Sequence, residues 1–139
     1  MPARWLEIAI AVDNTLISFH GRKKVEQYVL SLMNIVSNFQ SFKYILNVDV
    51  WLERRRTESL VSAIYQDPSL EANIKIIVTR LILYEHKKQG VVRPGNAKKS
   101  LENVNAWNRR LHASLDPDEP RHDLAIWLTR SDIGGPSGY

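Results

Sequence analysis

The chain has 139 residues, of which 44% are hydrophobic and 24% charged, an ordinary composition for one globular domain with its own core. Its net charge is +4, but the basic residues fall in short, scattered runs without interleaved aromatics, so we expect no nucleic-acid partner. The absence of cysteine excludes disulfides and thiolate metal sites. No apolar run approaches the about 18 residues that a membrane span needs.

The first part of the chain predicts a buried strand followed by an amphipathic helix. Residues Trp5–Val12 are apolar and β-branched and are closed by Asp13–Asn14, a pattern typical of a buried strand. We interpret Asn14–Phe19 as a connector. In Phe19–Asn38 apolar residues recur at steps of three and four, so this helix needs a sheet or other helices to cover it. Its apolar face comprises Val25, Tyr28, Val29, Leu32, Met33, Ile35 and Val36.

The remaining elements are two strands on either side of a second helix. Asn73–Tyr84 reads as a strand, although three polar residues interrupt its apolar run, and a polar loop follows it. Ala97–Ala113 reads as an amphipathic helix, and His122–Arg130 as a third buried strand after a proline-rich surface turn at 114–121. Strands that alternate with helices favour a parallel, right-handed α/β sheet of three strands. The inner stripe of the second helix comprises Leu101, Val104, Trp107 and Leu111.

Residues 39–63 interrupt this alternation. Their first half is strand-like and their second half is helix-like, with Arg54–Arg56 between the two halves, and no internal repeat explains them. They follow the first predicted helix at Asn38 and precede Ile64–Pro68, which reads as the exit turn of that same helix. We therefore predict that residues 39–63 are an insertion within one domain that spans residues 1–139.

Several motifs occur in an order that is typical of one protease group. They are FHG, a helix ending YVLSLMNIVSN, then IYQDPSLEANIKIIVTRLIL, GN with SLENV, and HDLAIWLTRSD. In this order they resemble the adamalysin/reprolysin branch of the metzincin proteases and, more narrowly, the secreted ADAMTS enzymes (disintegrin-like metalloproteinases with thrombospondin motifs). Gly95–Asn96 with Ser100–Val104, and the tail Gly135–Tyr139, are similar to the procollagen amino-propeptidase subgroup. The resemblance covers nearly the whole chain except residues 39–63.

The resemblance implies an α/β fold, a three-layer metzincin-like mixed sheet with flanking helices, of which this chain would hold only the incomplete amino-terminal subdomain. It also implies a secreted zinc metalloendopeptidase of the extracellular matrix as the full-length parent, although Met1–Arg4 shows no secretory signal. In relatives MNIVSN leads directly to IYQDPSL, which supports the interpretation of residues 39–63 as an insertion. Asn105 stands where the family usually has a cysteine.

The zinc site of that family has no counterpart in this sequence. It requires a His-Glu-x-x-His-x-x-Gly-x-x-His helix, in which two histidines lie one turn apart and the Glu acts as general base. The four histidines of the chain, His20, His86, His112 and His122, include no pair at i and i+4 and no such Glu. We expect each of them to be a surface or capping residue, and the chain to be catalytically inactive.

Glu7 and Asp123 are the candidate metal-ligating residues. A carboxylate such as Glu7 in an apolar strand is costly unless it is paired or bound to a cation, and Asp123 opens the third strand. If these strands are neighbours, they bring two hard oxygen ligands together, as a calcium site requires. The resemblance implies a structural calcium at these positions. A salt bridge to Arg4 or Arg121, or exposure to solvent, are the open alternatives.

The sequence leaves more than one function open. The chain is either the amino-terminal part of a zinc metalloendopeptidase whose parent cleaves matrix proteins, procollagens among them, or a non-catalytic extracellular binding or inhibitory module. The module would pair with its partner through the uncovered edge of the third strand. A chain that never folds stably is the third alternative, since uncovered apolar surface favours association. We interpret Asp13 and Asp132 as turn or capping residues.

Overall fold

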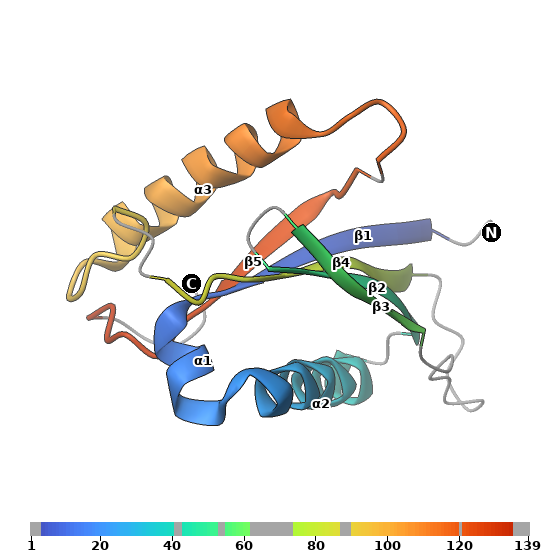
Figure 1. Ribbon diagram of the computed structural model, residues 1–139, viewed down its shortest axis with the longest axis horizontal. Coiled ribbons are helices and arrows are strands. Elements are labelled where there is room, and N and C mark those ends of the chain that lie inside the picture. The colour runs from blue at the N-terminus through green and yellow to red at the C-terminus, as the bar shows by residue number, and fades with distance from the viewer. Residues whose placement is uncertain are drawn as a thin grey trace.

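The computed structural model describes residues 4–40, 43–52, 55–61, 74–86, 90–119 and 121–134. Within these ranges the chain forms one five-stranded sheet between two layers of helix (Figure 1). The elements in chain order are β1 (Arg4–Val12), α1 (Asn14–His20), α2 (Arg22–Gln40), β2 (Lys43–Leu52), β3 (Arg55–Val61), β4 (Ile74–Leu83), α3 (Ala97–Ser114) and β5 (Leu124–Leu128). The predicted three-layer α/β fold is confirmed.

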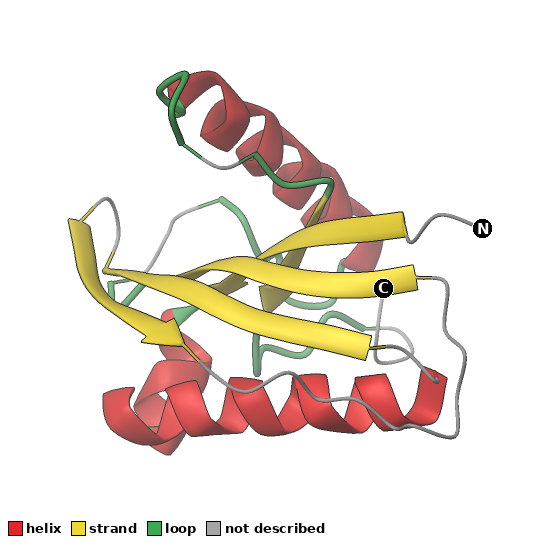
Figure 2. Ribbon diagram, turned by 90° about the vertical axis from the view of Figure 1, so that its right-hand side faces the viewer, coloured by secondary structure: helices red, strands yellow, loops and turns green. Residues whose placement is uncertain are grey.

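The sheet is mixed, with the strand order β3-β2-β4-β1-β5. β1 lies between β4 and β5 and is parallel to both, as the alternation of strands and helices predicts. β2 is parallel to β4 on its other side, and β3 is antiparallel to β2. Helices α1 and α2 cover one face of the sheet and α3 the other (Figure 2). The sheet therefore has two more strands than the three that the sequence predicts.

The additional strands come from residues 39–63. The strand-like first half is confirmed, since β2 runs beside β4 from the pair Lys43↔Lys75 to the pair Leu52↔Leu83. The helix-like interpretation of the second half is wrong, because residues Arg55–Val61 form β3. Antiparallel pairing with β2 satisfies the backbone groups of β3, and this tertiary context overrides a weak local pattern. Residues 43–52 and 55–61 are thus part of the sheet.

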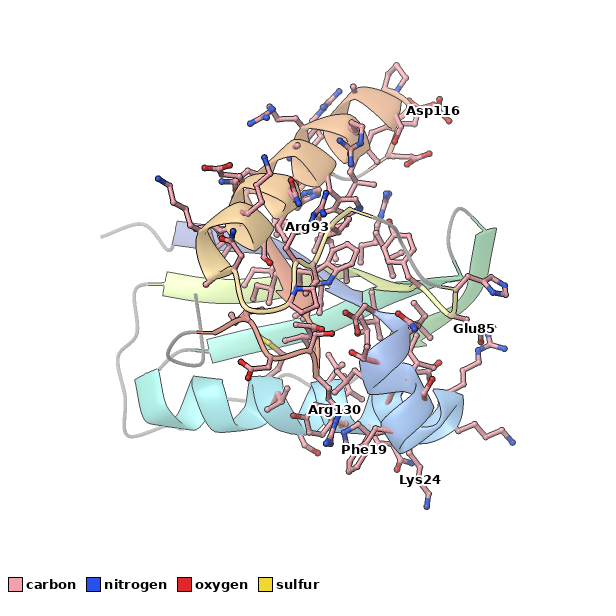
Figure 3. The ribbon with its side chains drawn as sticks, turned by 90° about the vertical axis from the view of Figure 1, so that its left-hand side faces the viewer. Phe19, Lys24, Glu85, Arg93, Asp116 and Arg130 are labelled. Carbon is pink, nitrogen blue, oxygen red and sulfur yellow. The ribbon has the colours of Figure 1, made fainter. Side chains whose placement is uncertain are left out.

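The predicted connector after β1 is a short helix, α1. The Asp13 carboxylate caps its amino end, since Oδ1 accepts hydrogen bonds from Thr15 N at 3.1 Å and Leu16 N at 3.3 Å. Gly21 ends the helix at φ +81°, a conformation that few other residues adopt. The prediction that Asp13 is a capping residue is confirmed. At the carboxyl end of α1, the Arg130 guanidinium carbon lies 3.5 Å from the ring centroid of the exposed Phe19 (Figure 3).

The first hydrophobic core lies between the sheet and helices α1 and α2. The predicted apolar face of α2 is confirmed where its side chains are described, because Val25, Val29 and Met33 are buried at intervals of four residues. Ile35 and Val36 lie outside the described side chains. The strands contribute alternate residues to this core, as a half-buried pleat requires. The buried members are Ile8, Ile10, Val12, Leu16, Ile17, Val25, Val29, Met33, Val78, Leu81 and Leu83.

A bulge in β4 accounts for two of the three polar residues that interrupt its apolar run, Thr79 and Arg80. The register with β1 shifts between the pairs Ile8↔Val78 and Ala9↔Arg80, so Thr79 is an extra residue. The alternation of faces changes at this point, and Val78 and Leu81 both belong to the first core. Arg80 consequently lies on the other face of the sheet, beneath α3.

The second core is aromatic and lies beneath α3. Tyr84, Trp107 and Trp127 contact one another, and Trp107 and Trp127 are edge-to-face with their ring centroids 5.0 Å apart. Val104, Trp107 and Leu111 pack against this core, as predicted for the inner stripe of α3. Leu101 is 43% exposed, so its assignment to that stripe is wrong.

Buried Ser100 explains why Leu101 turns outward. Ser100 Oγ accepts a hydrogen bond from Arg93 N at 2.8 Å and lies 2.8 Å from Asn96 O, to which it donates. Asn96 caps the helix by accepting from Lys99 N at 2.9 Å, and Asn103 Nδ2 donates to Val91 O at 3.1 Å. The GN and SLENV motifs therefore attach the loop before α3 to the first turns of that helix.

Gly95 and Gly134 bring two distant loops into close contact. Gly95 N donates to Asp132 O, and Gly134 N donates to Asp132 Oδ1, both at 2.8 Å, which confirms Asp132 as a turn residue. A Cβ atom on Gly134 would lie only 2.7 Å from Gly95 O. The contact therefore requires that residue 134 carry no side chain, whereas a Cβ atom on Gly95 would meet no atom within 4 Å.

Replacing Gly134 by alanine is therefore expected to lower the free energy of unfolding by about 1–3 kcal/mol more than replacing Gly90 by alanine. Both glycines have positive φ, +78° and +82°, so both substitutions incur the cost of a left-handed alanine. No atom lies within 4 Å of a Cβ on Gly90, so only the Gly134→Ala chain has the overlap. Urea unfolding of the two variants measures the difference, and equal stabilities would contradict the close contact.

Candidate metal centre

Glu7 and Asp123 lie side by side where β1 meets the start of β5. Asp123 N donates to Glu7 O at 2.8 Å, and Glu7 N donates to Asp123 Oδ2 at 3.0 Å. The next pair in the ladder, Ile8↔Leu124, continues this parallel register. The two residues are 116 positions apart in the chain, and the fold brings them together because β1 and β5 are neighbouring strands.

The Asp123 carboxylate also has a structural role. It accepts the Glu7 amide hydrogen at the point where the backbone ladder between β1 and β5 begins, in place of a strand carbonyl. Asp123 is exposed and Glu7 is half-buried, so both carboxylates can also reach a cation from solvent. Neither residue forms a salt bridge with Arg121, and the side chain of Arg4 lies outside the described residues.

The chemistry of this pair fits part of a calcium site. Calcium takes six to eight oxygen ligands, and carboxylates are the commonest charged ones. Among the residues that the structure describes, no group of three or more His, Cys, Asp or Glu side chains could hold a metal ion. Glu7 and Asp123 would therefore supply two ligand residues, and the other oxygens would come from water or from other groups.

A buried histidine precedes Asp123. His122 is 5% exposed, its Nε2 lies 2.6 Å from Asn108 Oδ1, and its ring stacks on that of His112 at a centroid distance of 4.1 Å. Burial lowers the pKa of His122 to about 4, and the neighbouring His112 and Arg80 act in the same direction. The expectation that His122 is a surface or capping residue is wrong, since two residues of α3 enclose it.

Arg80 is the second buried polar residue near this pair. It is 7% exposed, and its Nη2 lies 3.0 Å from Glu119 Oε2 in the connection between α3 and β5. The sequence shows Arg80 only as an interruption of a strand. A cation in a buried strand requires a compensating acidic partner, but the sequence does not indicate which acidic residue this is.

The histidines do not converge on a zinc site in the described structure. His20 stacks on Tyr28 with the ring centroids 4.2 Å apart, and His86 is exposed after β4. The stacked pair of His112 and His122 is the one place where two described histidines meet. Asn105 is exposed on α3. In the described part of the chain, none of the helices has the length and apolar character of a membrane span.

Comparison with known proteins identifies relatives of nearly the whole chain. "A disintegrin and metalloproteinase with thrombospondin motifs 1" of Bombyx mori is 43% identical over 135 residues, which cover 97% of this chain and 11% of that protein. Over nearly its whole length, the chain is homologous to a segment of ADAMTS proteins. ADAMTS 2 of Mus musculus is 36% identical over 135 residues, and ADAMTS 3 of Homo sapiens 32% over 137 residues, each covering 96% of this chain.

The ADAMTS relatives are much longer than this chain. The chain spans about a tenth of their length, 11% of the Bombyx mori protein and 9% of the mouse and human proteins. No family model matches the chain, and no solved structure matches it. The predicted resemblance to ADAMTS enzymes is confirmed, whereas the procollagen amino-propeptidase subgroup stays a prediction.

Proposed function

We propose that this chain is the amino-terminal portion of the catalytic domain of a secreted zinc metalloendopeptidase. In its full-length parent, this enzyme would hydrolyse peptide bonds in extracellular matrix proteins, procollagens among them. The observation that carries the proposal is the 43% identity to an ADAMTS protein over 97% of the chain. The name of that relative describes it as a metalloproteinase. The α/β sheet with helices on both faces agrees with a metzincin-like subdomain.

The chain itself would have no protease activity. In the parent, zinc would activate the attacking water. The zinc ligands would be histidines of a His-Glu-x-x-His helix, a motif that these 139 residues do not contain. The residues present would contribute the scaffold: β1, β4 and β5, with α2 and α3 on their faces. We expect the purified chain to retain no zinc after dialysis and to cleave neither gelatin nor peptides. Stoichiometric zinc together with cleavage would overturn the proposal.

The second candidate function is a non-catalytic extracellular binding or inhibitory module. In the described part of the sheet β5 has a strand neighbour on one side only, and such an edge can accept a strand from a partner. Transcripts distinguish the two functions. A message that continues into a zinc-binding helix supports the enzyme fragment, and a stable secreted product of 16.0 kDa supports the module.

The proposal includes a structural calcium ion at Glu7 and Asp123. The hydrogen bonds between Asp123 and the backbone of Glu7 keep the two residues on adjacent strands. A divalent cation bound by both carboxylates would offset the like charges of neighbouring acidic side chains. Titration of the chain with calcium chloride tests this assignment.

We also propose that residues 39–63 are an insertion relative to the family. The family resemblance implies that MNIVSN would continue directly into IYQDPSL, and this implication supports the proposal. Residues 43–52 and 55–61 fold with the domain as β2 and β3. β2 pairs with β4, which would otherwise be an edge strand of the sheet. The genomic sequence around codons 38–64 tests it, since splice junctions on both sides of the segment would identify an additional exon.

A further inference from the structure

We infer that Arg80 is a positioning residue for the Glu7–Asp123 pair. It acts through the α3–β5 connection, defined here by its described residues, 115–119 and 121–123. The inference rests on the calcium ion of the proposed function, and it assigns a role to a buried ion pair outside the two candidate ligands.

Arg80 is placed for this role by the bulge in β4. The extra residue Thr79 turns Arg80 onto the α3 face, where it pairs in register with Ala9 of β1. Its side chain is 8% exposed, and a buried guanidinium is costly unless the fold supplies a compensating partner. The Glu119 carboxylate, which is 29% exposed, supplies that compensation at 3.0 Å. The segment that carries Glu119 is thereby fixed to the sheet.

The α3–β5 connection is held at several points before it reaches Asp123. Leu115 is buried where the connection leaves α3, and Glu119 N donates to Asp116 O in a tight turn. Glu119 then binds Arg80, and His122 binds Asn108. Asp123 follows directly, with its amide and its carboxylate both bonded to the backbone of Glu7.

These contacts set the position of Asp123 before any ion binds. A ligand held in its binding geometry loses little conformational freedom on binding, and this raises affinity without any new contact. Removal of the ion pair at Glu119 would release the connection, and Asp123 would sample positions away from Glu7. Partners of metal ligands typically change metal affinity by about 10- to 100-fold when they are mutated.

The competing role for Arg80 is charge compensation of the two carboxylates. In that role Arg80 would oppose a cation, so its removal would tighten calcium binding. In the positioning role, removal of Arg80 would instead weaken calcium binding. The direction of the change in calcium affinity therefore distinguishes the two roles.

The experiment uses the whole chain with three substitutions: Glu119→Gln, Arg80→Met and Asp118→Asn. Glu119→Gln breaks the ion pair but keeps the charge of Arg80, and Asp118→Asn is the matched control. Asp118 is exposed in the same turn, so its substitution removes the same charge one residue away. Calcium dissociation constants come from isothermal titration, and hydrogen exchange of the Glu7 and Asp123 amides is measured in EDTA.

We expect Glu119→Gln and Arg80→Met to raise the calcium dissociation constant about tenfold, and Asp118→Asn to leave it within about twofold. We also expect faster exchange of the Glu7 and Asp123 amides in Glu119→Gln without calcium, which reports the position of the segment even where Arg80→Met does not fold. Tighter binding by Arg80→Met, or unchanged affinity and exchange in Glu119→Gln, would overturn the positioning role alone. The absence of calcium binding to the unaltered chain would overturn the calcium site and this inference with it.

Discussion

Replacing Trp107 by alanine is expected to lower the free energy of unfolding by about 3–5 kcal/mol, the usual cost of deleting a large buried aromatic side chain. Trp107 is 3% exposed and lies at the centre of the second core. Its ring is edge-to-face with that of Trp127, and its Nε1 donates to Tyr84 Oη at 2.9 Å. The substitution removes the packing and leaves the Tyr84 hydroxyl without this donor. Chemical denaturation followed by far-UV circular dichroism measures the loss.

Phenylalanine substitutions separate the hydrogen bond from the packing. Trp107→Phe retains an aromatic ring but loses the bond to Tyr84, so we expect a loss of about 1–2 kcal/mol from that source. Trp127 is the matched control, because its buried Nε1 has no hydrogen-bond partner among the described residues. Trp127→Phe removes an unsatisfied donor and is expected to cost less than Trp107→Phe. The opposite order would show that the Trp107 hydrogen bond does not stabilise the core.

The sequence was sufficient where one local pattern persisted over many residues. The buried residues Val25, Val29 and Met33 of α2 follow a period that the chain displays directly. The sequence analysis did not predict α1, because its seven residues are too few to show a clear helical period. The capping residue Asp13 is the stronger sequence signal for this helix. β3 escaped because its strand conformation depends on β2, and only pairing with a neighbour distinguishes it from a helix-like run.

Within the candidate site, the sequence allowed prediction of the two candidate ligands on neighbouring strands, but not of the contacts around them. Glu7 was identifiable because a carboxylate inside an apolar strand stands out, and Asp123 because it directly precedes the strand that becomes the neighbour of β1. The partners of Arg80 and His122 were not identifiable, since Glu119 is 39 residues from Arg80 and Asn108 is 14 residues from His122. The bulge at Thr79 decides which face Arg80 occupies, and nothing in the run of residues 74–83 specifies its position.

Acidification from about pH 6.5 to about pH 4 is expected to destabilise the fold through His122. Its pKa falls from 6.5 to about 4 in the folded chain, because burial, His112 and Arg80 all disfavour the charged ring, and only Asp123 favours it. The unfolded chain binds the proton first, so the stability present above pH 6.5 is lost as the pH falls, and no further loss arises from this group below pH 4. The total is on the order of 3 kcal/mol.

His122→Gln isolates this contribution, because glutamine keeps a polar group near Asn108 but does not titrate. We expect the stability of the unaltered chain to exceed that of His122→Gln by a constant amount above pH 7 and the gap to shrink between pH 6.5 and pH 4. His86→Gln is the matched control at an exposed histidine, and its pH profile should run parallel to that of the unaltered chain. Acid unfolding also protonates many carboxylates, and these act equally in all three proteins. A gap between the unaltered chain and His122→Gln that stays constant down to pH 4 would therefore mean that His122 is protonated as readily in the folded chain as in the unfolded one.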